Sequence, residues 1–323
     1  MHSAPRNVSR AKTCEREQPC AGDSARYTTD VGTAYATTRM RWAACDTIWS
    51  FPHAQCSLIL RAMPIHPTAI ISPQAQLDST VDVGPNVVIE EHVKVGAGTR
   101  IWANAYLTGH AEIGRDNEIH MGAVIGHEPQ DLKFDRSRRT YLRIGDRNVF
   151  REYCNIHRGT EPESATVIGN ECYIMATAHV GHNCVIGNNV IICNCALVAG
   201  HVHVGDRAFI SGGVVIHQFT HVGRLAMFSG NARVSMDVPP FTLAAERNEI
   251  HALNLVGLRR AKISREALGE LKKLYQLFYL SGMNGTQALA EATRDGAFTT
   301  PEAREFIEFV RNSPNGICPP ARV

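Results

Sequence analysis

Aliphatic residues return at every sixth position between Ile65 and Val234, in two frames that one longer step separates. Of the 27 positions on these frames, 24 hold Ile, Leu or Val, two hold Phe, and only Pro162 departs from the pattern. Glycine often follows one position after the aliphatic residue, and a small or β-branched residue often follows four positions after it. A strict period of six fits neither an α-helix nor the two-residue alternation of an ordinary strand. The pattern therefore predicts a solenoid of short stacked strands.

In such a repeat the large aliphatic residue points inward, a small residue fits beside it, and Gly or Asn takes the tight turn. Stacking the repeats buries a continuous aliphatic column while the backbones pair between coils. The pattern resembles that of the left-handed parallel β-helix, a prism with three repeats, or about 18 residues, per coil. The left-handed direction is implied by this resemblance alone, because ordinary crossovers are right-handed. We predict a mainly β protein with this fold at residues 63–240, and an inserted loop at 127–143.

Beyond the repeats the apolar pattern changes to that of helices. Ser264 can cap a helix over residues 265–281, and Thr300 precedes a second helix that begins at Pro301. Since an open last coil would expose a sticky edge, we predict that residues 241–323 form a small α-helical domain that covers it.

Composition narrows the classes of function. A net charge of +2 gives no basic field for nucleic acid, and no stretch is long and apolar enough for stable membrane insertion. The ten cysteines form no metal or disulfide framework, which favours small buried thiols in a reducing, cytoplasmic setting. Residues 1–62 lack the repeat, and we interpret them as a disordered extension or an artefact of an over-long gene model.

Histidines gather in the later repeats, in slots that the aliphatic residues do not use, so we expect their side chains on the outer surface. They are His157, His179, His182, His201, His203 and His217. A coil of about 18 residues stacks His182, Gly200 and Gln218 along one edge, with about 5 Å between successive coils. A neutral imidazole beside a glycine N–H offers a general base next to an oxyanion donor. This arrangement suits acyl transfer, although periodicity alone does not establish it.

Residues 63 to about 315 resemble the cytosolic UDP-N-acetylglucosamine O-acyltransferases that open lipid A biosynthesis. The hexad itself is common to many acyltransferases, whereas three stretches are far more specific. These are Gln130-Asp-Leu-Lys133, Ala178-His-Val-Gly-His182 and Asp237-Val-Pro-Pro240.

The resemblance implies transfer of a 3-hydroxyacyl chain from acyl carrier protein to the 3-hydroxyl of UDP-N-acetylglucosamine, without cofactor, metal or covalent acyl-enzyme. It makes His182 the general base and the Gly200 amide the oxyanion donor. The implied substrate contacts are Gln130, Asp131, Lys133, His157, His179, His201, His217, Gln218, Asn254 and Arg260. The family forms homotrimers with sites between subunits, and the loop that carries Lys133 reaches the neighbouring subunit's site.

Two positions refine this expectation. Gly230 corresponds to a position that limits acyl length, and because glycine has no Cβ we expect an open groove and a chain of about fourteen carbons. Asn183 stands where some relatives carry an acid next to the catalytic His, so carboxylate assistance from that position is lost, although an amide can still orient the ring. A basic surface for the acidic carrier protein is expected at Arg224, Arg259, Arg260, Lys262, Arg265, Lys272 and Lys273.

Three other hypotheses remain open. A γ-class carbonic anhydrase shares the solenoid, but its signature has a second His where this chain reads Gly187-Asn188. An acyltransferase that acts on a sugar amine carries an N-terminal recognition domain that residues 1–62 do not resemble. A non-catalytic scaffold leaves the stacked His182 edge and the Lys133 loop without a reason.

Overall fold

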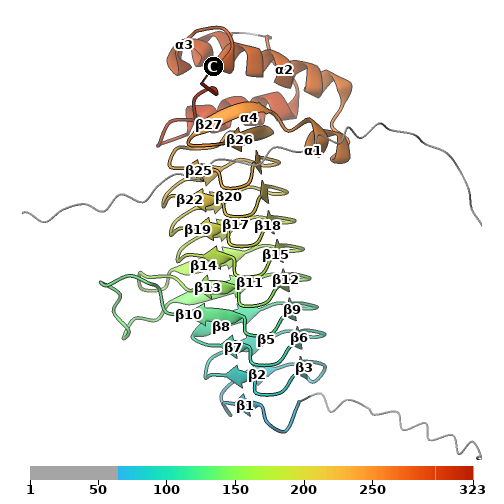
Figure 1. The fold of residues 1–323 in the computed structure, drawn as a ribbon, viewed down its shortest axis with the longest axis vertical. Helices are drawn as coiled ribbons and strands as arrows, with labels where there is room; N and C mark the ends of the chain where they lie inside the picture. The colour runs from blue at the N-terminus through green and yellow to red at the C-terminus, as the bar shows by residue number, and fades with distance from the viewer. Residues whose placement is uncertain (1–64, 295, 323) are drawn as a thin grey trace, which may run out of the picture. The chain divides into compact units, whose positions relative to one another are not determined.

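A computed structural model describes residues 65–294 and 296–322, so the predicted extension at residues 1–62 lies outside the described residues. Three sheets of short parallel strands form the three sides of a solenoid, and four helices lie at its C-terminal end (Figure 1). The predicted parallel β-helix and the C-terminal helical region are confirmed.

Each sheet takes one strand from every coil. The first sheet contains β1 (Ile70–Ile71), β4 (Val88–Ile89), β7 (Tyr106–Leu107), β10 (Val124–His127), β13 (Asn155–His157), β16 (His179–Val180), β19 (Leu197–Val198), β22 (Val215–Ile216) and β25 (Arg233–Val234). The second contains β2 (Gln76–Leu77), β5 (Lys94–Val95), β8 (His110–Ile113), β11 (Tyr141–Ile144), β14 (Ala165–Ile168), β17 (Val185–Ile186), β20 (His203–Val204) and β23 (His221–Val222). The third contains β3 (Asp82–Val83), β6 (Arg100–Ile101), β9 (Glu118–Ile119), β12 (Val149–Phe150), β15 (Tyr173–Ile174), β18 (Ile191–Ile192), β21 (Phe209–Ile210), β24 (Met227–Phe228), β26 (Thr242–Ala245) and β27 (Glu249–Leu253).

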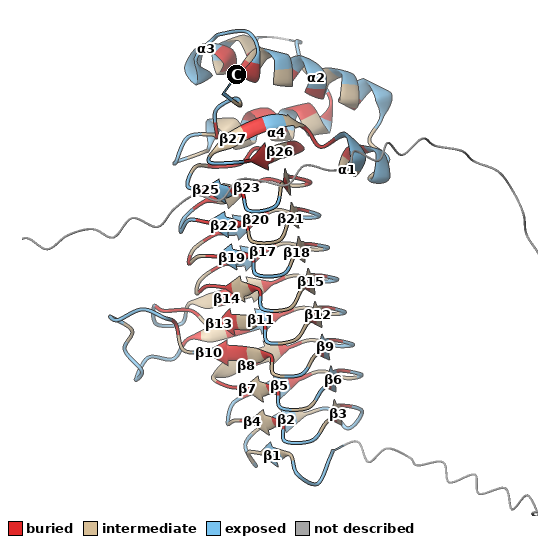
Figure 2. Ribbon diagram, in the orientation of Figure 1, coloured by how far each residue is buried: buried red, intermediate tan, exposed pale blue. Residues whose placement is uncertain are grey.

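Within each sheet the register of the strands stacks the aliphatic frame residues in one column. Val180 pairs with Val198, and Val198 pairs with Ile216, so each coil lies directly on the next. These three side chains are fully buried, and buried residues follow the inside of the solenoid along its length (Figure 2). The stacked column stabilises the solenoid because every added coil removes apolar surface from water on both of its faces.

Three corners join the sheets, and many corner residues adopt the left-handed backbone region. At the first corner, between the first and second sheets, Asn183, His201 and Phe219 have φ of 59°, 60° and 66° on successive coils. Asn tolerates this region, whereas a bulky aromatic side chain is disfavoured there. The same backbone turn is thus kept on three successive coils, although its side chain changes from an amide to an imidazole to a phenyl ring.

Two longer excursions leave the solenoid at this first corner. One runs between β10 and β11 and includes the predicted inserted loop, which stands out from the side of the prism (Figure 1). The other runs between β13 and β14, over residues 158–164, and includes Pro162, the position where the repeat fails. Both excursions lie on coils below His182.

The third sheet continues past residue 240, since β26 pairs parallel with β24 and β27 pairs antiparallel with β26. The predicted domain boundary at 240 thus lies just before the last two strands of the sheet. An antiparallel last strand ends the parallel ladder, and four helices follow it. They are α1 (Leu255–Arg260), α2 (Arg265–Tyr279), α3 (Gly285–Ala292) and α4 (Pro301–Arg311).

The predicted caps of α2 and α4 are confirmed. The Ser264 side chain accepts a hydrogen bond from the Ala267 N–H, and Thr300 caps α4 with Pro301 in its first turn. The sequence interpretation missed α1 and α3, which are short. Among the described residues, no helix combines the length and apolar character needed to cross a membrane.

Candidate active site

His182 and Gly200 meet at the first corner on successive coils, as the repeat spacing predicts. The His201 N–H donates to the His182 carbonyl at 2.9 Å, which fixes the two coils in register. The imidazole lies over the glycine so closely that a Cβ built on Gly200 would come within 2.6 Å of its Cε1 and 2.7 Å of its Nε2. In the described part of the chain the Gly200 N–H donates no hydrogen bond.

Asn183 fixes the orientation of the His182 ring. Its Oδ1 lies 2.9 Å from His182 Nδ1 and also accepts hydrogen bonds from the N–H and Oγ1–H of Thr160, at 3.0 and 2.8 Å. Because this oxygen is only an acceptor, His182 Nδ1 must carry the proton that it shares with Asn183. The Nε2 lone pair on the Gly200 side of the ring is then free to accept a proton.

The second excursion supports Asn183 from the other side. Asn183 Nδ2 donates to Glu161 Oε2 at 2.8 Å and to Ser164 Oγ at 3.0 Å. Both residues come from the segment around Pro162, where the repeat fails. Sequence reasoning missed this contribution, and the break in the aliphatic frame was the signal that could have revealed it.

The rings of the other predicted histidines surround this pair. His201 lies edge-on to His182 with ring centroids 5.1 Å apart, and His179 lies edge-on to His157 at 4.9 Å. Phe219, on the next coil, stacks on His201 at 4.6 Å. Three coils thus present a continuous band of aromatic rings at one edge of the prism.

The expectation that all these imidazoles lie on the outer surface is wrong for His157. Its exposure is only 2%, because the rings of His127 and His179 on the neighbouring coils lie against it. Burial, with a smaller contribution from the neighbouring His179, lowers the pKa of His157 to about 3. The ring is therefore neutral at physiological pH.

This burial predicts a pH dependence of stability. The His157 pKa is about 3 in the folded protein against about 6.5 in an unfolded chain, so the unfolded state binds the proton first as pH falls. The contribution to stability is complete above pH 6.5 and is lost progressively toward pH 3. In His157→Asn, the fall in unfolding free energy between pH 7.5 and pH 5 should be about 1–2 kcal/mol smaller than in wild type. Urea unfolding at both pH values measures this difference, and the exposed His217→Asn should behave as wild type does; an unchanged pH dependence in His157→Asn would contradict the assignment.

His217 and Gln218 lie at the same corner, one coil beyond Gly200, and both are exposed. The Phe219 N–H donates to the Gly200 carbonyl at 3.1 Å, which places Gln218 in line with Gly200 and His182 as predicted. The stacked edge of His182, Gly200 and Gln218 is therefore confirmed as a feature of the fold.

The predicted contacts on the inserted loop form no hydrogen bond or ion pair with His182 in the described part of the chain. Gln130, Asp131 and Lys133 are all exposed, and the Asp131 carboxylate accepts a hydrogen bond from the Lys133 N–H at 2.9 Å. Between them Leu132 is fully exposed.

Asn254 and Arg260 lie at a different corner, between the second and third sheets. They border a cavity of about 570 Å³ together with Arg207, which the sequence interpretation did not select. Asn254 is 6% exposed, and its side chain accepts from the Gly257 N–H and donates to the Leu225 carbonyl, both at 2.9 Å. Its amide thus caps α1, whereas the arginines Arg207 and Arg260 are exposed beside the cavity.

Gly230 lies at the third corner, which joins the third sheet to the first. A Cβ built there would meet only the Gly212 carbonyl oxygen, at 3.6 Å, so the position is open. The outer face of the first sheet separates this corner from Gly200, and it carries Leu197 and Val215, which are 46% and 39% exposed. An apolar surface therefore lies between the His182 corner and the Gly230 corner.

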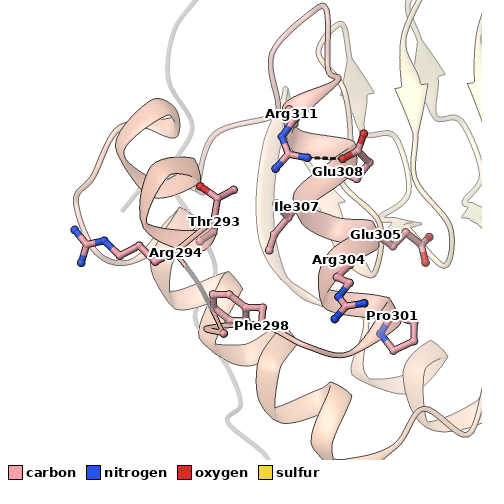
Figure 3. A pocket seen from close by; sticks show the side chains of 11 residues that line it. Thr293, Arg294, Phe298, Pro301, Arg304, Glu305, Ile307, Glu308 and Arg311 are labelled. Atoms are coloured by element: carbon pink, nitrogen blue, oxygen red, sulfur yellow. Dashed lines mark hydrogen bonds and ion pairs between the residues drawn. The ribbon is translucent and has the colours of Figure 1, made fainter.

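A further hollow of about 620 Å³ lies between the end of α3 and α4 (Figure 3). Arg311 pairs with Glu308 there, at 2.5 Å. None of the predicted site residues borders it. Arg224, one of the expected carrier contacts, also proves to be engaged, since its guanidinium pairs with Glu305 of α4 at 2.7 Å. This ion pair joins the solenoid to the helical region.

Comparisons with known proteins agree with this architecture. The family model of UDP-N-acetylglucosamine O-acyltransferase, domain 2, matches residues 237–318, and the bacterial transferase hexapeptide model matches residues 92–127 and 165–200. The chain is similar to the UDP-N-acetylglucosamine O-acyltransferases of Thermodesulfovibrio yellowstonii and of a Psychrobacter species. Identity to the first is 42% over 256 residues, covering 79% of this chain and 98% of that protein. Identity to the second is 46% over 255 residues, covering 78% and 98%.

A solved structure gives the same result. The UDP-N-acetylglucosamine acyltransferase of Bacteroides fragilis superposes with a TM-score of 0.74 at 39% identity, over 78% of this chain and 99% of that one. Sequence and fold thus agree over both the solenoid and the helical region, and the chain belongs to the UDP-N-acetylglucosamine O-acyltransferase family.

Proposed function

We propose that this protein transfers a 3-hydroxyacyl chain from acyl carrier protein to the 3-hydroxyl of UDP-N-acetylglucosamine, in the cytoplasm, as the opening step of lipid A biosynthesis. Family membership supports the reaction and the names of the relatives supply the substrates. The observation that carries the proposal to individual residues is the contact between the His182 ring and Gly200, whose N–H is unoccupied.

In this proposal His182 Nε2 removes the proton from the sugar 3-hydroxyl as its oxygen attacks the thioester carbon. The Gly200 N–H donates to the oxyanion of the tetrahedral intermediate, where the negative charge develops. Collapse of the intermediate breaks the carbon–sulfur bond, and the imidazolium returns its proton to the departing thiolate of the carrier. All atoms are accounted for without an acyl-enzyme, so no Ser or Cys nucleophile is required.

We infer that a complete site needs a second copy of the chain, in a homotrimer. His182 lies at the first corner of the prism, whereas Arg207 and Arg260 lie at the second. In a homotrimer the first corner of one prism and the second corner of its neighbour can line a single cleft, so that one UDP-sugar contacts His182 of one subunit and Arg207 and Arg260 of the next. The fully exposed Leu132, beside Lys133 on the protruding loop, fits burial against a neighbouring subunit. Arg207 and Arg260 then suit the diphosphate, since a guanidinium group can donate two parallel hydrogen bonds to phosphate oxygens.

The acyl chain has one apolar path from the reacting centre. It crosses Leu197 and Val215 on the first sheet toward the open corner at Gly230. One side of the prism is six residues wide, or at most about 20 Å at the rise of an extended strand. A chain of about fourteen carbons fits that width better than a short one does.

The proposal is tested with purified full-length protein and 3-hydroxyacyl carrier proteins of several chain lengths. We expect a mass in solution three times the chain mass of 35.5 kDa, and O-acylated UDP-N-acetylglucosamine as the product, with the fourteen-carbon donor preferred. The 3-amino analogue of the sugar serves as the competing acceptor. Acylation of that analogue alone would replace the proposed acceptor, and failure with both acceptors from a folded trimer would contradict the proposal.

A further inference from the structure

Asn183, which is hydrogen-bonded to the proposed base His182, is itself hydrogen-bonded to the Glu161 carboxylate. Asn183 Oδ1 accepts three hydrogen bonds, from His182 Nδ1 and from the N–H and hydroxyl of Thr160. Asn183 Nδ2 donates two, to Glu161 and to Ser164. Both polar atoms of the amide therefore form hydrogen bonds, which fix the orientation of the Asn183 side chain. The hydrogen bond to His182 Nδ1 in turn orients the imidazole.

Glu161 supplies the only charge in direct contact with that amide among the described residues. Partial burial opposes ionisation of its carboxyl, but hydrogen bonds, the largest from Thr160, outweigh that effect and lower its pKa. The group is therefore a carboxylate at neutral pH, 2.8 Å from Asn183 Nδ2. A hydrogen bond to an ionised acceptor is stronger than one to a neutral acceptor, and it polarises the bond that follows in the chain.

We propose that Glu161 is a positioning residue for His182 and acts through the Asn183 amide. By accepting from Nδ2–H, the carboxylate pushes electron density through the amide toward Asn183 Oδ1, which makes that oxygen a better acceptor for His182 Nδ1–H and makes Nε2 a stronger base. This chain thus provides from the 158–164 excursion the negative charge that an amide at position 183 cannot provide. The inference rests on the proposed role of His182 as the base.

The other titratable groups around this pair are histidines on adjacent coils. His201 Nε2 lies 4.0 Å from Glu161 Oε1, and the His201 ring is 5.1 Å from that of His182. His157 and His179 also lie within electrostatic range of His182. Burial is the largest cause that lowers the pKa of all three of these neighbours, so they are neutral at physiological pH. Of the charged groups around His182, Glu161 is therefore the one whose removal should change the basicity of the His182 ring most.

The decisive variant is Glu161→Gln, which keeps the size of the side chain and an oxygen for Asn183 but removes the charge. Loss of this negative charge disfavours the imidazolium, so the His182 signal in Glu161→Gln should change over a lower pH range than in wild type. The acid limb of kcat/KM should move in the same direction, and kcat should fall about three- to tenfold because the base is weaker. NMR of histidine-labelled full-length protein, with the signal assigned by its loss in His182→Ala, measures the titration without substrate.

Two controls separate this role from a merely structural one. Glu163→Gln removes a carboxylate two residues away that binds the Tyr141 hydroxyl at 3.0 Å and not Asn183; it should behave as wild type does. Asn183→Asp in the Glu161→Gln background places a carboxylate directly on His182 Nδ1 and should return the acid limb toward its wild-type position. An unchanged His182 titration in Glu161→Gln overturns the inference, as does a folded double variant that regains nothing.

The same measurements distinguish this inference from the proposed function. If the wild-type protein acylates neither acceptor while the His182 titration still moves in Glu161→Gln, the proposed function fails and the link from Glu161 to His182 stands. If wild type is active and the titration does not move, the proposed function stands and the role of Glu161 is refuted.

Discussion

Replacing His182 by Ala should lower kcat/KM for acyl transfer about a thousandfold or more, which is the range that a positioned general base supplies. The imidazole is the one group that the fold presents beside a free glycine N–H at this corner, with its Nδ1 occupied by Asn183. Removing it leaves the oxyanion donor in place but no acceptor for the hydroxyl proton. Initial rates with 3-hydroxymyristoyl carrier protein and UDP-N-acetylglucosamine measure the loss.

A matched control is available on the next face of the same solenoid. His203 is an exposed histidine in a strand of the second sheet, where its ring lies edge-on to that of His221 at 4.9 Å. His203→Ala removes an equivalent side chain away from the first corner, so its activity should remain within a few-fold of wild type. Retention of wild-type turnover by His182→Ala would refute the assignment of the base, even though the family stands.

Gly200→Ala should abolish most activity by a different route, with a fall in kcat of about a hundredfold or more. The added methyl group would lie 2.6–2.7 Å from two atoms of the His182 ring, closer than carbon and nitrogen atoms pack. The ring must rotate or the coil must shift, and either change separates the base from the amide. Because φ at Gly200 is not in the left-handed region, the loss is steric and does not come from backbone strain.

Thermal unfolding of Gly200→Ala shows whether the effect is local. The melting temperature should fall only by a few degrees, since the clash is with a half-buried ring and not with the aliphatic column. Gly269→Ala, in α2, adds a methyl group with no atom within 4 Å and should leave activity unchanged. Full activity in Gly200→Ala would mean that the imidazole and this amide do not act on the same reacting centre.

Many positions in the candidate site can be predicted from residue spacing, because in a solenoid a fixed separation in sequence corresponds to a fixed separation in space. Residues 18 apart become vertical neighbours, so the spacing of His182 and Gly200 is enough to predict that they lie together. The family resemblance adds the chemistry but not the geometry. Asn183 illustrates the limit: the sequence reveals its chemistry, but not the five hydrogen bonds that saturate it.

Three features depend on contacts that no repeat encodes. Glu161 reaches Asn183 because an excursion folds back over the corner, and an irregular loop has no period from which its path follows. The family resemblance implies a substrate contact at Asn254, but it does not reveal that this amide caps a short helix. The sequence also predicts that Arg224 faces the carrier, but it pairs with Glu305 across 81 residues of sequence.

The period of six is therefore enough to predict the solenoid, and together with the 18-residue coil that the β-helix resemblance implies it predicts that His182 stacks on Gly200, because burying one aliphatic residue in six aligns the repeats. Other features of the site depend on tertiary contacts, which the stacking register does not specify. The tertiary structure placed the proposed base and the arginine-lined cavity at different corners, buried His157 between two other imidazoles, and brought the Glu161 carboxylate to the amide that orients His182. Those outcomes depend on loops and side-chain packing, where many conformations satisfy the same local pattern and only the complete set of contacts selects one.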